Sequence, residues 1–223
     1  MSPFLLRREL QDLEETESNF IFVERGVYMQ SNGNKLPLNE MTRWELINKS
    51  KRESKRRMDI AKRGIYKPKD FNNVDFESLF TTDTFVWRSR VGDYIVTVSF
   101  EGAFSNLYMM IGSWSGKNRY KRIDLKMLTK CLSKALDEED IYVDCTCPDF
   151  LYRFSWWLTQ ADAKYGVQQG RPPRVRNVNN NQGGACKHVL SVLYGKRWVP
   201  AAAKAWLQYI QQNPELAEEL IWG

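Results

Sequence analysis

Three of the four cysteines and the only histidine of this 223-residue chain fall in two short stretches. Cys145 and Cys147 lie in "IYVDCTCPDF", and Cys186 and His188 lie in "GGACKHVL". One residue separates the members of each pair, so on a strand or tight turn both side chains can reach one ion. Three thiolates and one imidazole satisfy the tetrahedral preference of Zn²⁺. If one ion joins both pairs, the fold must bring these two distant segments into contact.

A metal-free explanation of the same residues is that they are small buried hydrophobes plus a histidine of the core. That explanation suits an isolated cysteine, whereas two matched spacings that use the only histidine favour zinc. A disulfide between Cys145 and Cys147 is disfavoured because so short a ring is strained. Cys131 lies on the apolar stripe of an expected helix at residues 123–137 and is interpreted as core. Four protein ligands leave no position for water, so the predicted site is structural.

The order Cys-x-Cys then Cys-x-His, with "CPDF" after the first pair and "CKHVLSVL" at the second, resembles the SWIM-type zinc finger. The resemblance covers about residues 141–194 and implies that Cys145, Cys147, Cys186 and His188 bind zinc. It also implies a strand pair before the first cysteines, a helix that carries the histidine, and a role in binding DNA or protein partners. The 38-residue gap at 148–185 is longer than is usual in that family and implies an inserted helix and loop.

The longer context "DIYVDCTCPDFLYRFSWW", followed by an Asn-rich loop and "GGACKH", is also similar to proteins encoded by tailed bacteriophages. This second resemblance implies an assembly role and a location in a virion. The N-terminal sequence has the wrong order of charged and apolar residues for a secretory signal, and no stretch approaches 18 apolar residues. We therefore expect an intracellular, reducing compartment and no contact with a membrane.

Basic residues concentrate in two segments, although the net charge of the whole chain is only +6. The segment 43–63 carries nine basic and three acidic residues, and a second group lies at 171–197, near the expected metal site. Such clusters can neutralise phosphates and release counterions. A solvated helix face or a docking surface for an acidic protein explains them equally, so these alternatives stay open. The candidate nucleic-acid-binding residues are Lys51, Arg52, Lys55, Arg56, Arg57, Arg171, Arg174, Arg176 and Lys187.

Aromatic residues follow the first cysteine pair and admit two interpretations. They could stack on the bases of a single strand, but their position on a short expected helix favours ordinary core packing. The residues concerned are Phe150, Tyr152, Phe154, Trp156 and Trp157.

The motifs that catalysis requires are missing. "VGDY" and "NQGGAC" lack the lysine and the spacing of a phosphate-binding loop. The one histidine is assigned to the metal, so Ser-His and Cys-His nucleophile pairs lack a base. The acidic run 138–140 is explained more simply as surface charge. We therefore expect no enzymatic activity and no small-molecule substrate, with nucleic acid or the other proteins of an assembly as partners.

Local patterns predict the secondary structure around these sites. "FVWRSR", "VGD" and "YIVTVSF" predict a β-hairpin, a third strand is expected at Asn106–Trp114, and "IYVDC" is a short strand. Helices are expected at 4–18, at 38–63 ending on Gly64, and at 123–137, and extended pieces at 19–37. Further helices are expected from Cys186 onward, with a break near Asn213-Pro214.

Together these patterns predict an α+β protein: a small antiparallel sheet, formed by about 84–114 and joined by 141–145, with a SWIM-like zinc site and helices at both ends. We expect an N-terminal helical segment with the basic helix at 1–70, and an α+β zinc-binding domain at 71–223.

Overall fold

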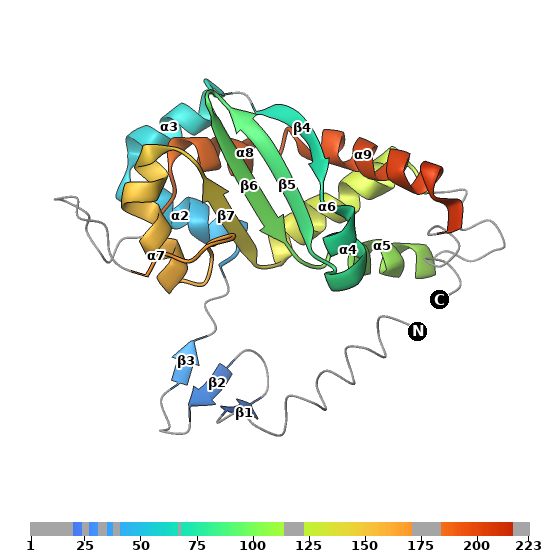
Figure 1. The fold of residues 1–223 in the computed structure, drawn as a ribbon, viewed down its shortest axis with the longest axis horizontal. Helices are drawn as coiled ribbons and strands as arrows, with labels where there is room; N and C mark the ends of the chain where they lie inside the picture. The colour runs from blue at the N-terminus through green and yellow to red at the C-terminus, as the bar shows by residue number, and fades with distance from the viewer. Residues whose placement is uncertain are drawn as a thin grey trace. The chain divides into compact units, whose positions relative to one another are not determined.

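The computed structural model describes residues 20–23, 27–30, 35–37, 41–66, 68–113, 123–170 and 184–215 (Figure 1). The chain divides into two compact units, with the boundary between Glu40 and Met41. This boundary differs from the expected division after residue 70, because the basic helical segment packs within the second unit. The helix expected at 4–18 lies outside the described residues.

The first unit contains a three-stranded antiparallel meander. Its strands are β1 (Phe20–Val23), β2 (Val27–Gln30) and β3 (Lys35–Pro37). They lie where the sequence predicts extended segments.

The second unit is an α+β fold built on a four-stranded antiparallel sheet. Its order is β4 (Lys69–Val74), β5 (Phe85–Val91), β6 (Tyr94–Phe100) and β7 (Ile141–Cys145). The predicted hairpin is confirmed as β5 and β6, joined by a turn in which Gly92 has a φ of +64°. Strand β4 was not predicted, because "KDFNNV" has only one β-branched residue among polar ones that are rare in strands, and its pairing with β5 is irregular.

The prediction of a strand at Asn106–Trp114 is wrong, since residues 106–112 belong to helix α5 (Ala103–Gly112). Its buried apolar residues Ala103, Leu107 and Ile111 recur every four residues, which is the period of one helix face. The Asp83 carboxylate accepts hydrogen bonds from the backbone N–H groups of Phe104 and Ser105, and so caps the first turn. Asp83 lies 20 residues before Ala103, the first residue of α5, so a local sequence pattern does not reveal this cap.

The single helix expected at 38–63 is two helices, α2 (Arg43–Glu53) and α3 (Lys55–Lys62). Thr42 and Glu45 form a capping box at the start of α2. Ser54 adopts an extended backbone between the helices, and its hydroxyl accepts a hydrogen bond from Arg57 N–H. Serine favours such a cap because its hydroxyl competes for backbone groups, so the chain restarts as a second helix.

Part of the remaining helices covers one face of the sheet, whereas α7 lies beside β7 and α4 near one end of the sheet. Figure 1 shows α6 crossing behind β5 and β6 and α8 behind β6, whereas α9 runs outward past β4. The bounds are α4 (Phe76–Thr82), α6 (Leu125–Glu138), the π-helix η2 (Phe150–Phe154), α7 (Ser155–Gln160), α8 (Lys187–Gly195) and α9 (Val199–Gln212). The expected helix at 123–137 is thus confirmed as α6, and its stripe, including Cys131, is buried, apart from an exposed Leu125.

The core lies between the sheet and these helices. Trp87 of β5 stacks on Trp198, with ring centroids 5.5 Å apart, and Phe85 packs beside Trp206 of α9. All four side chains are almost completely buried. Large aromatic side chains contribute much of the burial energy of such a core. None of the described helices combines the length and apolar character that crossing a membrane requires.

A partly buried ion network joins three helices. Arg43 of α2 donates to the Asp137 carboxylate of α6 at 2.7 Å and to the Leu193 carbonyl of α8 at 2.8 Å. Lys196, just after α8, contacts the other Asp137 oxygen and donates to Ser133. Arg43, which the sequence places in the basic cluster, is therefore buried and structural. Asp137 compensates two cations, so its charge is important for the packing of α2 and α8.

We predict that Asp137→Asn lowers the free energy of unfolding by about 1–3 kcal/mol, because it leaves Arg43 buried without a carboxylate. Urea denaturation followed by circular dichroism measures this. Glu138→Gln is the matched control, since Glu138 pairs with Lys134 on the exposed side of the same helix. We expect a change below about 0.5 kcal/mol for it. Equal effects of the two substitutions would contradict the structural role of Asp137.

Candidate metal centre

The first cysteine pair is positioned by the end of strand β7. Cys145 pairs with Val96 of β6, and Thr146 continues the pairing, since its N–H donates to Ile95 O and its hydroxyl accepts from Ile95 N–H. Thr146 is exposed whereas Cys145 and Cys147 are buried, as the two-residue period of a strand requires. The backbone N–H of Phe150 donates to Cys147 Sγ at 3.3 Å. The sheet therefore holds both thiols on one side.

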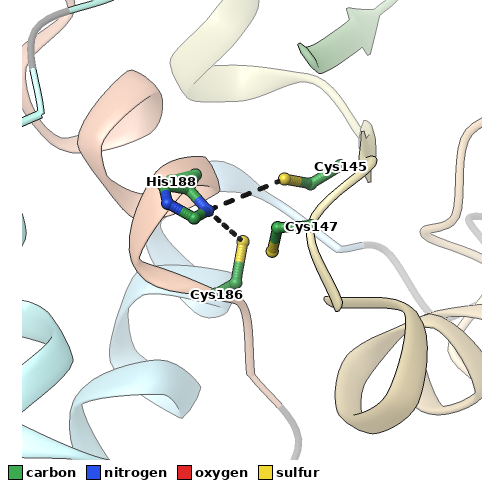
Figure 2. Close-up of side chains that lie close together, drawn as sticks. All are labelled: Cys145, Cys147, Cys186 and His188. Carbon is green, nitrogen blue, oxygen red and sulfur yellow. Dashed lines mark hydrogen bonds between the residues drawn. The ribbon is translucent and has the colours of Figure 1, made fainter. Parts of the chain in front are cut away.

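The second pair is positioned by the N-terminus of helix α8. Cys186 is the N-cap residue and His188 lies in the first turn. The positive end of the helix dipole lies at this terminus, which favours thiolates over thiols beside it. Figure 2 shows the sulfur atoms of Cys145 and Cys186 joined to the same nitrogen of His188 by the dashed contacts. That nitrogen is Nδ1, and it lies 4.0 Å from each sulfur.

The four ligand atoms form one compact, buried group. They all lie within 4.8 Å of one another, and none of the four residues is more than 4% exposed. Ligands in a tetrahedral zinc site lie about 3.5–3.8 Å apart, as follows from bond lengths of about 2.0 and 2.3 Å. The group is slightly wider than this, so small side-chain movements suffice to close it on one ion. The predicted ligand set Cys145, Cys147, Cys186 and His188 is thus brought together and fits a metal ion.

Electrostatics also favours a cation at this position. The hydrogen bond from Cys145 holds the pKa of Cys147 well below its usual range, and the same interaction raises the pKa of Cys145 to about 12. Burial raises the pKa of Cys186 well above its ordinary value, and the two neighbouring cysteines raise it further. These pKa shifts show that the three buried thiols oppose one another's ionisation when no cation lies between them. A divalent cation allows all three to ionise, so metal binding releases protons.

Cys131 has a different environment. Its thiol contacts the Met110 sulfur at 3.1 Å, and burial raises its pKa to about 12. It is a core residue, as predicted, and it lies outside the metal-binding group.

Tyrosine rings line the histidine side of the centre. The His188 ring makes an edge contact with Tyr66, at 5.0 Å between centroids, and lies 4.9 Å from Tyr94. Lys187 Nζ lies 4.9 Å from the centre of the Tyr66 ring, and a hydrogen bond with Tyr66 raises the pKa of Lys187. These rings fix the imidazole orientation. Their contribution depends on tertiary packing, so no local sequence pattern indicates it.

The segment entering α8 is anchored on α2. Ala185 N–H donates to Ser50 Oγ at 2.9 Å, and that hydroxyl donates to Leu46 O at 2.7 Å. Gly184 has a φ of +154°, and a Cβ added there would lie 3.3 Å from Ser50 Cα. This close backbone approach requires glycine and places Cys186 beside the other ligands. The Gly183-Gly184 dipeptide in the sequence was the available signal for it.

The predicted nucleic-acid-binding residues have different environments. Lys51, Arg52, Lys55 and Arg56 are exposed, and Lys187 is half-buried beside Tyr66. Arg57 lies 3.4 Å from the Asp149 carboxylate and over the Phe154 ring, so it links α3 to the turn after Cys147. Arg171, Arg174 and Arg176 lie outside the described residues. Of the aromatic cluster, Phe150 and Phe154 are buried as core, whereas Tyr152 is 58% exposed.

No protein-family model, curated protein or solved structure matches this chain.

We predict that the purified protein contains one zinc ion per chain and that Cys186→Ala removes it. Loss of a structural zinc ion reduces the free energy of unfolding by an amount on the order of 10 kcal/mol. This variant should therefore be largely unfolded. Cys131→Ala is the matched control, because it deletes an equally buried thiol outside the centre. It should retain zinc and unfold at a slightly lower temperature. Metal analysis with thermal denaturation distinguishes the two, and zinc retained by Cys186→Ala would contradict the assignment.

We also predict that Gly184→Ala destabilises the protein by about 1–3 kcal/mol, because of backbone strain and the close contact with Ser50. Gly170→Ala is the control at the other end of the same segment, since its added Cβ meets nothing within 4 Å. Chemical denaturation of the zinc-loaded variants measures both. An unchanged free energy of unfolding for Gly184→Ala would contradict the requirement for glycine at the close contact with Ser50.

Proposed function

We propose that this protein is a non-enzymatic, zinc-stabilised module of the SWIM type that binds nucleic acid through exposed basic side chains. The observation that carries the proposal is the packing of α3 against α8, the helix that supplies two of the four metal ligands. A metal ion at the centre would therefore stabilise the packing of α3, the basic helix, against α8, which belongs to the second basic group.

The exposed cations of α3 and of the residues that directly follow α3 and α8 form what we call the basic face. A Cβ added at Gly64, just after α3, would lie 3.4 Å from Arg197 Nη1, so the ends of both basic segments meet. Arg43 and Arg57 form ion pairs with Asp137 and Asp149, so these two cations have a structural role. The basic face consists of Lys55, Arg56, Lys62, Arg63 and Arg197, and Lys51 and Arg52 precede it.

The surroundings of the basic face favour a polyanion as the partner. No Asp or Glu occurs between Ala163 and Pro214, a stretch that includes all of α8 and α9. Helix α3 carries one carboxylate, Asp59, against the four cations that it and its C-terminal end contribute to the basic face. Clustered cations in such an excess attract phosphate groups and release their counterions. Lys187 faces Tyr66 and the metal centre, so we assign it to the centre rather than to the partner.

The chemistry of the centre favours binding over catalysis. Zn²⁺ held by four protein side chains has no open position for a water molecule or a substrate. The only histidine of the chain is among those ligands. We therefore infer that zinc stabilises the fold and takes no part in a reaction.

A second candidate function is a structural or assembly protein of a phage particle, in which zinc stabilises a docking surface. Exposed apolar side chains favour protein contacts of this kind: Met109 of α5 is 59% exposed and Leu125 of α6 is 40% exposed. A protein that stays monomeric and is absent from every particle would contradict this alternative.

We predict salt-dependent binding of the zinc-loaded protein to fluorescein-labelled oligonucleotides, measured by fluorescence anisotropy. The logarithm of the association constant should fall linearly with that of the KCl concentration. A chelator should abolish binding together with the folded signal in circular dichroism, and added zinc should restore both. The absence of salt-dependent affinity for DNA and RNA, single- or double-stranded, would remove nucleic acid as the partner.

A further inference from the structure

We infer that the basic face binds single-stranded nucleic acid, with Tyr194 as a stacking platform for a base. This inference rests on the proposed function and specifies its ligand. It starts from the position of Tyr194, which lies near the C-terminal end of α8, six residues or about 1.7 helical turns beyond the metal ligand His188.

Tyr194 is an exposed aromatic side chain among cations. Its side chain is 39% exposed, and Lys62 Nζ of α3 lies 5.8 Å from the centre of its ring. Arg197 follows three residues later, and its guanidinium lies beside Gly64 at the end of α3. A tyrosine ring bordered by cations suits an unpaired base that stacks while its phosphates contact the basic side chains.

The cations of α3 are arranged as a track for a strand. Lys55 and Lys62 are seven residues apart, as are Arg56 and Arg63, so each pair lies on one side of the helix. Seven residues of α-helix span about 10.5 Å. This length corresponds to about three nucleotides of a stacked strand with a rise of 3.4 Å. The opposite side of α3, with Met58 and Ala61, is buried.

The stacking platform distinguishes a single strand from a duplex. In a duplex the bases are paired and stacked on each other, so an exposed tyrosine beside the phosphates gains little. In a single strand every base has a free face, and the aromatic contact adds affinity that salt does not screen. The structure therefore predicts two separable contributions: a salt-dependent one from the cations and a salt-independent one from Tyr194.

Tyr194→Ala tests the stacking contribution. Probes are fluorescein-labelled 20-nucleotide single strands of mixed sequence, as DNA and as RNA, and the corresponding DNA duplex. We expect the zinc-loaded variant to bind both single strands about 5- to 100-fold more weakly, with an unchanged salt slope. Duplex binding should be unaffected. Tyr108→Ala is the matched control, since Tyr108 on α5 is 40% exposed, and it should bind as the parent protein does.

Lys55→Gln combined with Lys62→Gln tests the phosphate track. Each phosphate contact contributes about 0.7 to the salt slope for a single strand, so the double variant should have a slope smaller by about 1.4. The control, Lys126→Gln with Lys130→Gln, removes two exposed lysines of α6 and should leave the slope unchanged. Circular dichroism and zinc content verify that all variants are folded.

The outcomes separate this inference from the proposed function. Salt-dependent binding that is equal for single strands and duplex, or that Tyr194→Ala leaves unchanged, would overturn the single-strand assignment while the proposed function stands. An equal loss of slope in both lysine double variants would also overturn it, because binding would then follow net charge alone. No binding to any probe would contradict the proposed function itself.

Discussion

Three buried cysteine sulfurs within reach of one imidazole nitrogen are the constraint on which this fold depends. Cys145, Cys147 and Cys186 cannot all ionise in a buried site without a cation, and as thiols they would fill the space with weak hydrogen-bonding groups. A divalent cation reduces the charge of three thiolates from −3 to −1. The Phe150 N–H group and the N-terminus of α8 stabilise the remaining charge. A bound metal ion would therefore tie the end of β7 to the start of α8.

The position of this junction explains its influence on the rest of the chain. It closes a loop of 38 residues between Cys147 and Cys186, and closing such a loop without a cross-link carries an entropic penalty. Ser50 and Gly184 add a second attachment, from the segment before α8 to α2. Asp137 adds a third, through Arg43 and Lys196. Helix α8 is thus held at both ends, and α3, which packs on it, is held in turn.

The sequence predicted those features whose cause is local. The hairpin of β5 and β6 follows from alternation around a Gly-Asp turn, and the ligand set follows from two one-residue spacings. Helix α5 was mistaken for a strand because its cap, Asp83, is remote and its residues have mixed propensity. Tyr66, Ser50 and the buried Arg43 were missed or misassigned because only tertiary contacts define their roles. Charge and spacing in the sequence identify candidate ligands and cations, but tertiary packing decides which cations stay exposed.

The geometry of α8 has a thermodynamic consequence for the proposed ligand. His188 lies at the metal end of the helix and Tyr194 at its other end, and no flexible segment lies between them. The centre and the basic face are therefore coupled through the folding of one rigid element, not through a movement between two folded states. Binding energies coupled in this way are reciprocal. A ligand that binds only the folded protein then increases the apparent affinity for zinc, by an amount that grows with ligand concentration relative to its dissociation constant. A closed, buried metal site suits this coupling, because it affects the folding that forms the basic face and does not contact the ligand itself.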